Sequence, residues 1–379
     1  MINVVEVSSD SNIGGAGKCI LTLLKTYDRE KFNISVVLPR NSLLKPEVEA
    51  LKVKVFEIDN LAEKSLSRKA VWRLRHLFNY LMPDIVHTHA SMSARIAAKL
   101  CGIKVVYTRH SVFEPPKRIS SGIGKLLNGF INNHTADRII AVAEAAKENL
   151  VKTGVKADKI QVILNGVDAL TPYTEEQIKK VKAEYGIGDG QKVAAIVARL
   201  NVVKGHKYFV EAARIIRDHE IDAKFLIAGT GEVEEELKKQ ISDYELEDVV
   251  IMLGFLEDVE PLMNILDVQV NCSFGTEATS LSLLEGMSLG KPAVVTEFGG
   301  NPGVIEDGKN GYLLPIHNPD DMAVKIEKLF TDQQLYNTMK NNCTRIYNKK
   351  FTSKVNTRNI ENVYIELFES SKKTVRRSK

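Results

Sequence analysis

The sequence predicts an α/β protein built from two consecutive doubly wound units, each a parallel sheet with crossover helices. Apolar, β-branched runs alternate with helical patterns along the chain, which is typical of parallel sheets. The length of 379 residues suits two domains of about 100–200 residues each. The run 164–168, followed by Pro172, interrupts the alternation, and a second series then begins. We therefore expect two domains that meet at a hinge over residues 165–175.

The first series predicts an N-terminal domain over residues 1–168. Its expected strands are residues 3–8, 33–38, 53–58, 84–89, 104–108, 138–142 and 161–164. Helical patterns lie between them, for example at residues 68–81 and 91–100. Strands that alternate with helices pair in parallel, because a parallel connection needs a crossover segment.

The second series predicts a domain over residues 169–355. Its expected strands are residues 192–198, 224–228, 249–253, 268–271, 293–296 and 311–314, with helices that include 207–218 and 233–244. The stretch from about 320 to 370 is helical without a further strand. We expect residues 356–379 to form a C-terminal helix that returns to the N-terminal domain and ends in a basic tail. Two such units imply a cleft between them, since these sheets bind ligands at the carboxyl ends of their strands.

Composition favours a reducing cytoplasm. The hydrophobic fraction of 44% and the charged fraction of 26% are those of a soluble globular protein. No apolar run approaches the roughly 20 residues that span a bilayer, and the strand-like opening at residues 2–7 leads us to expect no signal peptide. The four cysteines show no paired spacing for zinc or a redox couple.

The net charge of +4 is unevenly distributed. Residues 1–168 hold 25 Lys and Arg against 16 Asp and Glu, whereas the rest of the chain holds 27 against 32. A basic N-terminal half suits an anionic partner such as a membrane surface or a phosphorylated lipid, and scattered solvated lysines are the alternative. The sequence has no cluster of aromatic and basic residues of the kind that recognises nucleic acid, so a nucleic-acid partner is not expected. Five basic residues stand in the last nine positions: Lys372, Lys373, Arg376, Arg377 and Lys379.

The segment 277–287 follows a buried strand and opens a helix. Glu277 stands in the loop before the helix, where its carboxylate can face a ligand. Ser280 is a candidate N-cap, and backbone N–H groups near Ser280 and Leu281 suit a diphosphate. Glu285 lies more than a turn further along and can reach a ribose. The alternative is an amphipathic helix with an incidental surface glutamate.

A second segment, residues 199–206, follows the first strand of the second domain. Its cations, Arg199 and Lys204, could neutralise a leaving diphosphate, the first as a fork and the second as a point charge. On their own they could equally be surface charge. The two segments lie about 80 residues apart yet belong to the same expected sheet edge, which favours a site.

Together these segments resemble the family 4 glycosyltransferases. Glu277 and Glu285 match the family's E-x7-E pattern, and Arg199 and Lys204 match its R-x4-K pair. The resemblance continues at residues 142–145, 163–168 and 298–303, in the expected order over nearly the whole chain. It implies the GT-B fold, in which two Rossmann-like domains face a cleft, with acceptor binding in the first and nucleotide-sugar binding in the second.

The resemblance also implies residue roles. Arg199 and Lys204 would hold the donor diphosphate, Glu277 the hydroxyls of the transferred sugar, Glu285 the ribose, and the loop around Leu256 the base. Residues 278–280 depart from the Pro-Phe-Gly or Gly-Phe-Gly run of many members, so the donor sugar stays open. The expected catalytic residues are Glu277, His110, Arg199 and Lys204, and the expected donor-binding residues are Gly15, Arg199, Lys204, Leu256, Ser280, Leu281 and Glu285.

A glycine-rich run at residues 12–18 follows the opening strand. It is neither a Walker A loop nor a complete G-x-G-x-x-G fingerprint. Its glycines would let the backbone approach a ligand, and the resemblance implies a place near the donor phosphate and the acceptor, with Gly15 as a contact. The alternative is a plain turn from strand to helix.

Three histidines end predicted strands of the first half. His110 matches the family histidine that faces the transferred sugar, and a buried structural histidine is the alternative. Of His87 and His89 we expect only one to face the site. Without a third ligand in place we predict no metal site.

Residues 117–127 mix cations with apolar side chains and could touch a bilayer or a lipid-linked acceptor. A mobile acceptor loop or an ordinary helix start is the alternative. The expected location is the cytoplasm, with peripheral contact at the inner face of an anionic membrane as a further hypothesis.

The predicted reaction is transfer of a sugar, with retention, from a nucleoside diphosphate donor to a hydroxyl of a glycan or lipid-linked acceptor. A UDP-hexose or UDP-N-acetylhexosamine is the expected donor, surface polysaccharide the expected product, and no cofactor or obligatory metal is expected. The alternatives are a nucleotide-sugar epimerase of the same fold and a sugar-binding protein without catalysis. A dinucleotide oxidoreductase is disfavoured, because the glycine fingerprint is incomplete.

Overall fold

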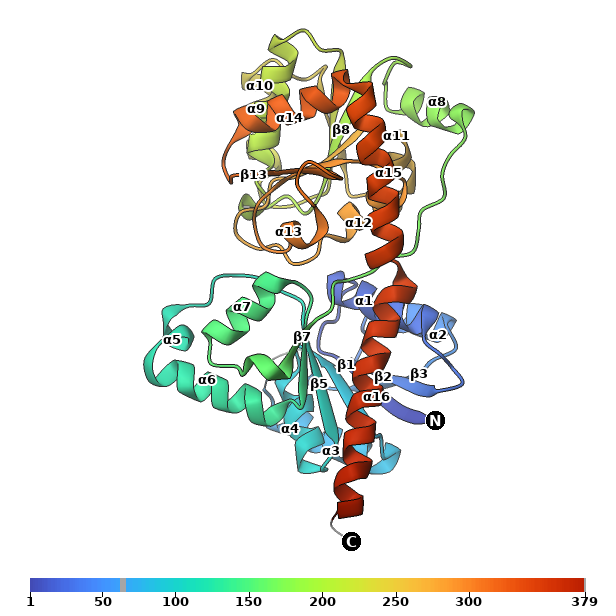
Figure 1. Cartoon of the computed structure of the whole chain (residues 1–379), viewed down its shortest axis with the longest axis vertical. Coiled ribbons are helices and arrows are strands. Elements are labelled where there is room, and N and C mark those ends of the chain that lie inside the picture. Colours follow the sequence, from blue (N-terminus) through green and yellow to red (C-terminus); the bar gives the residue numbers. More distant parts are fainter. Residues whose placement is uncertain (62–65, 378–379) are drawn as a thin grey trace. The chain divides into compact units, whose positions relative to one another are not determined.

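The computed structural model describes residues 1–61 and 66–377, which form two compact units (Figure 1). Unit 1 comprises Met1–Gly166 together with the chain from Thr352 onward, and unit 2 comprises Val167–Phe351. The sequence prediction set its boundaries two residues after Gly166 and four after Phe351. The second difference has a local cause, because the helix α16 (Ser353–Arg377) is uninterrupted from Ser353 and packs with unit 1 as one piece.

Unit 1 is built on a seven-stranded parallel sheet in the order β3-β2-β1-β4-β5-β6-β7. Its strand order reverses between β1 and β4, and doubly wound sheets bind ligands outside the carboxyl ends of their strands at such a point. The strands are β1 (Ile2–Ser8), β2 (Phe32–Pro39), β3 (Lys54–Ile58), β4 (Ile85–His89), β5 (Lys104–Arg109), β6 (Arg138–Ala141) and β7 (Ile160–Val162).

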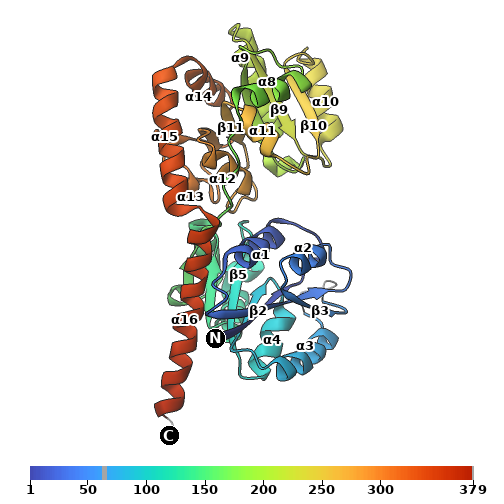
Figure 2. The ribbon, with the colours of Figure 1, turned by 90° about the vertical axis from the view of Figure 1, so that its right-hand side faces the viewer.

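Helices cover both faces of this sheet. Figure 2 shows α16 along one side of unit 1 and α3 and α4 on the other. Residues Val363, Tyr364 and Leu367 of α16 are buried in the same core as Phe32 of β2, and the rings of Phe32 and Tyr364 meet edge to face with centroids 5.9 Å apart. The other helices are α1 (Gly15–Thr26), α2 (Leu44–Ala50), α3 (Arg68–Leu81), α4 (Met92–Leu100), α5 (Lys117–Ser120), α6 (Gly122–Thr135) and α7 (Glu144–Lys152).

Unit 2 is built on a six-stranded parallel sheet in the order β10-β9-β8-β11-β12-β13. The reversal of strand order lies between β8 and β11, so the expected ligand position is at the carboxyl ends of these two strands. The strands are β8 (Lys192–Val197), β9 (Ala223–Ala228), β10 (Val250–Gly254), β11 (Val268–Asn271), β12 (Ala293–Thr296) and β13 (Gly311–Leu314).

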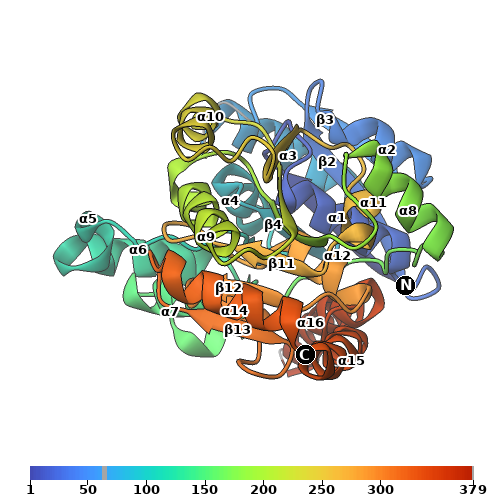
Figure 3. The ribbon, with the colours of Figure 1, turned by 90° about the horizontal axis from the view of Figure 1, so that it is seen from above.

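The helices of unit 2 likewise pack on both faces of its sheet. Figure 3 shows α9 and α14 side by side, and both contribute buried apolar residues, such as Phe209 and Ile326, to one core cluster. The helices are α8 (Glu175–Glu184), α9 (His206–Asp218), α10 (Glu234–Asp243), α11 (Glu260–Ile265), α12 (Leu281–Ser288), α13 (Asn301–Val304), α14 (Pro319–Thr331) and α15 (Gln333–Lys350).

The predicted fold class is confirmed, since both units are parallel sheets flanked by helices. Every strand expected from the sequence is present, and β11, β12 and β13 have the predicted bounds. Among the described residues, no helix combines the length and apolar character that crossing a membrane requires.

Candidate active site

Two loops of unit 2 lie together at the carboxyl edge of its sheet. The first joins β8 to α9 and carries Arg199 and Lys204, and the second joins β11 to α12 and carries Glu277. The N–H of Phe274 in the second loop donates to the carbonyl oxygen of Val203 in the first, at 2.9 Å. The reversal of strand order between β8 and β11 is what makes these two loops neighbours.

The first loop turns at a glycine that no other residue could replace without strain. Gly205 has φ +70°, and a Cβ at this position would lie 2.3 Å from the carbonyl oxygen of Cys272 at the end of β11. A side chain here would meet both a left-handed backbone and a backbone clash. Gly205 therefore lets the chain next to Lys204 approach the second loop closely.

Lys204 and Glu277 form an ion pair between the two loops. The Lys204 Nζ lies 2.8 Å from Glu277 Oε2, and it also donates to the carbonyl oxygen of Thr276 at 3.2 Å. The side chains are only 19% and 8% exposed, so removal of either partner would leave a poorly hydrated charge. The sequence predicted both residues at this edge but not their contact.

Glu277 is held on its side chain and on its backbone. Its Oε2 also accepts from the Asn271 side-chain amide at 3.0 Å and from the Ser273 hydroxyl at 2.8 Å. Its carbonyl oxygen accepts from the N–H of Gly300 at 3.1 Å, and at Gly299, with φ +59°, a Cβ would lie 2.2 Å from that oxygen. The carboxylate therefore has a defined orientation. Sequence reasoning missed Asn271 and Ser273, although their place at the end of β11 could have indicated them.

Helix α12 begins at Leu281 with Ser280 in the N-cap position, as predicted, but the Ser280 side chain makes no capping hydrogen bond. Its hydroxyl pairs instead with the hydroxyl of Ser282 at 3.0 Å, and Ser282 donates to the carbonyl oxygen of Val197 at the end of β8, at 3.2 Å. Glu285 lies on the next turn of α12 and is partly exposed. The start of α12 is thus bonded to the end of β8 through Ser282. The Ser280 side chain does not cap the backbone N–H groups of the first turn of α12.

The other two predicted donor-binding positions of unit 2 lie at the same sheet edge. Arg199 is exposed and follows β8 by two residues. Leu256 follows β10 by two residues, and its half-buried side chain packs against an apolar cluster of the unit. Both belong to loops at carboxyl ends of strands, where the sequence prediction put them.

Gly15 and His110 belong to unit 1. Gly15 is the first residue of α1, directly after the loop that follows β1, and a Cβ built on it would meet nothing within 4 Å. The space beside its backbone is therefore open. His110 is partly exposed and follows β5 by one residue, also at the carboxyl edge.

His110 is the last member of a chain of hydrogen-bonded polar side chains that are otherwise buried. Sequence reasoning identified its histidines but missed Glu6. Nε2 of His110 lies 2.7 Å from Nδ1 of His89, and Nε2 of His89 lies 2.8 Å from Oε2 of Glu6. His87 also contacts Glu6, with 3.2 Å between Nδ1 and Oε1. The prediction that only one of His87 and His89 could face the site was wrong, because residues two apart in a strand share a face. A carboxylate in the apolar strand β1 was the signal for Glu6.

Glu6, His87 and His89 also bring ligand atoms within 4.8 Å of one another, and among the described residues they form the group that could be considered for a metal. Carboxylate and imidazole are suitable zinc ligands. However, Glu6 Oε2 and His89 Nε2 are 2.8 Å apart. Two ligands of a tetrahedral zinc stay about 3.4 Å apart, given bonds of about 2.1 Å. The geometry is that of direct hydrogen bonds.

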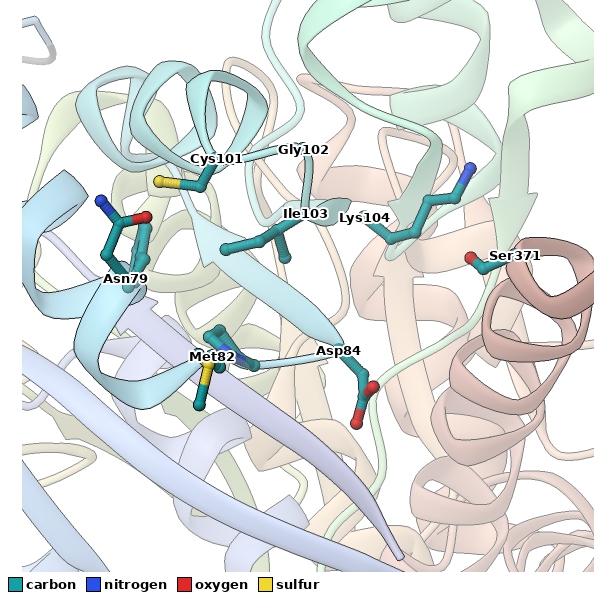
Figure 4. A pocket seen from close by; sticks show the side chains of 10 residues that line it. Asn79, Met82, Asp84, Cys101, Gly102, Ile103, Lys104 and Ser371 are labelled. Carbon is teal, nitrogen blue, oxygen red and sulfur yellow. The ribbon is translucent and has the colours of Figure 1, made fainter. Parts of the chain in front are cut away.

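Unit 1 also has a pocket of about 730 Å³ at the opposite, amino-terminal edge of its sheet (Figure 4). Asp84 and Lys104, at the starts of β4 and β5, line it together with Ser371 of α16. None of the predicted site residues lines this pocket. Because doubly wound sheets bind ligands at the carboxyl edge, we do not assign it to the site.

Comparisons with known proteins cover both units. Residues 13–169 match the family described as Glycosyltransferase Family 4, and residues 177–345 match Glycosyl transferases group 1. The chain is 29% identical over 97% of its length to UDP-Gal:alpha-D-GlcNAc-diphosphoundecaprenol alpha-1,3-galactosyltransferase of Escherichia coli, also over 97% of that protein. It is 28% identical over 76% of each chain to N-acetyl-alpha-D-glucosaminyl L-malate synthase of Bacillus anthracis.

Solved structures share the fold. The crystal structure of Alr3699/HepE from Anabaena in complex with UDP superposes with a TM-score of 0.83 at 22% identity, over 96% of this chain and 100% of that chain. The apo form of the lipopolysaccharide outer core galactosyltransferase WaaB gives a TM-score of 0.73 at 18% identity, over 96% and 99%. Family matches over both units, the fold, and the motif residues at the strand ends agree with one another. The chain belongs to the family 4 glycosyltransferases of the GT-B fold, and it is an enzyme of nucleotide-sugar-dependent glycosyl transfer.

Proposed function

We propose that this enzyme transfers a hexose or an N-acetylhexosamine from a UDP-sugar to a hydroxyl of a glycan or lipid-linked acceptor, with retention, in the synthesis of a surface polysaccharide. The observation that carries the proposal is the Lys204–Glu277 ion pair, which joins the loop after β8 to the loop that leads to the start of α12. A cation, a carboxylate and a helix N-terminus in two adjoining loops suit a diphosphate beside sugar hydroxyls. The UDP complex of the Anabaena protein and the UDP-Gal of the E. coli relative's name support uracil as the base.

Lys204 and Arg199 would stabilise the leaving diphosphate. The ammonium of Lys204 has three N–H donors, of which Glu277 and Thr276 take two, so a third can reach a phosphate oxygen. The exposed Arg199 guanidinium would bind the same group as a fork, and the backbone N–H groups at the start of α12 would add fixed dipoles. Donors held in place before reaction stabilise the charge that develops as the bond breaks.

The carboxylates would bind hydroxyls of the donor. Glu277 is oriented by Asn271 and Ser273, so its carboxylate can accept from hydroxyls of the transferred sugar. Glu285, one turn into α12, would accept from the ribose. The backbone at Leu256 would contact the base. These roles come from the resemblance to the family, and the geometry of each loop supports them.

The reaction would proceed by attack on the face of the sugar from which the diphosphate departs. The bond between the anomeric carbon and the diphosphate oxygen breaks, the acceptor oxygen bonds to the same face, and its proton passes to the departing phosphate oxygen. The transition state has oxocarbenium character. Because Lys204, Arg199 and the helix dipole supply the positive charge, we propose that no divalent cation is obligatory.

An anionic acceptor would suit a pocket of about 250 Å³ in unit 1, lined by residues of β5, α4, α6 and α7. Its lining contains two arginines and three asparagines and no Asp or Glu. The buried Arg95 stacks on Tyr107 and donates to Asn132 at 2.8 Å, while its Nε finds no hydrogen-bond partner among the described residues. Arg109 is the second cation. This charge supports an acceptor that carries phosphate, like the diphosphoundecaprenol in the name of the E. coli relative.

Helix α6 would hold the enzyme at an anionic membrane. Four apolar side chains of α6 are more than half exposed, and residues 115–136 contain no Asp or Glu but several cations. Apolar burial and about 1 kcal/mol per cation near an anionic surface would both favour binding. Replacement of Leu126 and Phe130 by serine should release the enzyme from vesicles containing phosphatidylglycerol, whereas the same change at the exposed Tyr80 of α3 should not. Of the predicted basic tail, Lys372 belongs to the described side chains and adds positive charge, whereas the side chains after it lie outside the described residues.

Thermal unfolding with added nucleotides tests the donor site. UDP should raise the midpoint with EDTA as well as with Mg²⁺, and GDP, ADP and NAD should raise it less, because a ligand that binds the native state stabilises it. Lys204→Ala should abolish the shift, whereas Lys207→Ala, at an exposed lysine of α9, should retain it. A shift from NAD alone, or none, would refute the site. Product analysis would then separate transfer to an acceptor from epimerisation without one.

A further inference from the structure

A buried chain of hydrogen bonds in unit 1 leads from the C-terminal helix to His110. The hydroxyl of Tyr364 on α16 donates to Oε1 of Glu6 at 2.6 Å. The other carboxylate oxygen of Glu6 lies 2.8 Å from Nε2 of His89, and Nδ1 of His89 lies 2.7 Å from Nε2 of His110. Tyr364, Glu6 and His89 are buried, and only His110 is partly exposed.

The protonation states along this chain follow from one another. Burial opposes ionisation of Glu6, but His87 and His89 outweigh it and hold the pKa of its carboxyl well below the usual range. An ionised carboxylate only accepts hydrogen bonds, so His89 donates from Nε2. Burial, together with His87, lowers the pKa of His89, and burial with His89 lowers that of His110 still further. Both rings are therefore neutral at pH 7.

A neutral His89 that donates from Nε2 has a lone pair on Nδ1. The facing nitrogen, Nε2 of His110, must then carry a hydrogen, which leaves Nδ1 of His110 as an acceptor. The ring geometry agrees with this bond. The two ring planes differ by 22° and their centroids are 5.0 Å apart, as expected for a contact that runs edge to edge in the ring plane.

The branch through His87 is consistent with the same assignment. Nδ1 of His87 lies 2.6 Å from the Tyr364 hydroxyl and 3.2 Å from Oε1 of Glu6, while Nε2 lies 2.6 Å from the Thr108 hydroxyl. Because Tyr364 gives its hydrogen to Glu6, His87 donates from Nδ1 and accepts from Thr108 at Nε2. Every polar hydrogen of the group then has an acceptor, and such a satisfied network favours one arrangement.

We propose that Glu6 is a positioning residue, which acts through His89 to hold His110 in the Nε2–H tautomer with Nδ1 as an acceptor for a substrate hydroxyl. The last clause rests on the proposed function, since the resemblance places His110 at the transferred sugar. Tyr364, 358 residues away in the chain, steadies the carboxylate from the C-terminal helix. A ring that presented N–H instead would repel the hydroxyl hydrogen that it should accept.

Histidine ¹⁵N NMR of the full chain tests the tautomer directly, with the His110 signals assigned from their loss in His110→Gln. Wild type should show unprotonated Nδ1 at His110. In Glu6→Gln the new amide can donate to Nε2 of His89, which reverses the chain and moves the His110 proton to Nδ1. Glu6→Asp keeps a carboxylate and should retain the wild-type tautomer. Glu57→Gln, in strand β3 of the same sheet, two strands away from β1, and paired with Lys45, is the matched control that should change nothing.

Kinetics give an independent readout. Glu6→Gln should lower kcat at least tenfold, with little change in KM for the donor and unchanged UDP binding, because unit 2 supplies the diphosphate contacts. A His110 that already has Nδ1–H in wild type, or one whose tautomer is the same in Glu6→Gln, would overturn the proposal. If Glu6→Gln does not fold, His89→Gln decides, because it removes the link while leaving Glu6 its contacts with His87 and Tyr364. If wild type transfers no sugar, the proposed function fails while the NMR result still decides the role of Glu6.

Discussion

The carboxyl edges of the two sheets hold their polar side chains in opposite ways. In unit 2 the charged residues stand on loops, and Lys204 and Glu277 form an ion pair that is still partly open to solvent. In unit 1 the carboxylate of Glu6 stands on a strand and is completely buried, and of the hydrogen-bonded residues Tyr364, Glu6, His89 and His110 only His110 is partly exposed. The charged loop residues of unit 2 can therefore act on a ligand through their charge, whereas Glu6 and His89 can act only through the orientation of His110.

The largest expected effect is on transfer in Glu277→Gln. The amide keeps the shape of the side chain but weakens the sugar contact, so kcat/KM should fall about 100-fold, in line with loss of one preorganised group. UDP should bind as tightly as in wild type or more tightly, because Lys204 is no longer shared with a carboxylate. Initial rates and calorimetric titration with UDP would measure the two quantities.

Two variants sharpen this prediction. Lys204→Ala should weaken UDP binding, whereas Glu297→Gln, at an exposed residue directly after β12, should alter neither quantity. If Glu277→Gln weakens UDP binding as much as Lys204→Ala does, the task of Glu277 is to hold the loop. The Glu277 carboxylate of unit 2 would then act on the ligand only through the residues that it positions, as the Glu6 carboxylate of unit 1 does.

Glycines at the two edges should respond differently to alanine. Gly205→Ala should lower the free energy of unfolding of unit 2 by about 2 kcal/mol, because it combines φ +70° with a Cβ 2.3 Å from the Cys272 carbonyl oxygen. Gly15→Ala should change stability by less than about 0.5 kcal/mol, since the space around it is open. Hydrogen exchange of β8 and fluorescence of Trp72, the single tryptophan, would follow units 2 and 1 in urea. Equal losses would contradict the distinction.

The sequence predicted the fold well because strand and helix patterns are local. Short segments rich in Val and Leu predicted β11, β12 and β13 with their observed bounds. The bounds of short segments were predicted less accurately, and β7 is only Ile160–Val162 where residues 161–164 were expected. The segment 117–127 contains the short helix α5 and the beginning of α6, which agrees with the alternative of an ordinary helix start, although the break at Ser121 was not predicted.

The candidate site was predictable only as far as family motifs and strand ends reach. Arg199, Lys204 and Glu277 were assigned to one edge, but Lys204 and Glu277 are 73 positions apart and the sequence between them contains no pattern that indicates a contact. Glu6 and Tyr364 were missed because their pairing depends on how α16 packs against β1, which no local spacing encodes. A lone carboxylate in a buried strand remains the one signal that pointed there.

Acid should destabilise unit 1 more than unit 2. Burial lowers the pKa of His89 and of His110 in unit 1, and in unit 2 it lowers the pKa of His206 to about 4. The pKa of each of these histidines is lower in the folded chain than in the unfolded chain, so below about pH 6.5 the unfolded chain binds protons more readily. The free energy of unfolding therefore falls as the pH is lowered. His206, with a folded-state pKa of about 4, should contribute about 1 kcal/mol of loss at pH 5.5, and His89 and His110 should add losses of the same sign in unit 1. Urea unfolding followed by Trp72 fluorescence at pH 7.5 and 5.5 would measure unit 1.

Two variants separate the buried histidines from histidine titration in general. His110→Gln should reduce the loss at pH 5.5, because one group that titrates only in the unfolded chain is gone. His134→Gln, at an exposed histidine of α6, should leave it unchanged. An equal loss in all three proteins would show that the buried group does not control the acid response of unit 1.

The smallest expected effect concerns the start of α12. A serine at an N-cap ordinarily contributes about 1 kcal/mol to stability through its capping bond. Ser280 makes no such bond, so Ser280→Ala should cost less than about 0.5 kcal/mol, whereas Asn318→Ala should cost about 1 kcal/mol, since Asn318 caps α14 by accepting from Asp321 N–H at 3.1 Å. Urea unfolding of unit 2, monitored by hydrogen exchange, would compare them. A larger loss of unfolding free energy in Ser280→Ala would mean that the Ser280 side chain stabilises the helix N-terminus. The backbone N–H groups of α12 would then not be free to bind the diphosphate.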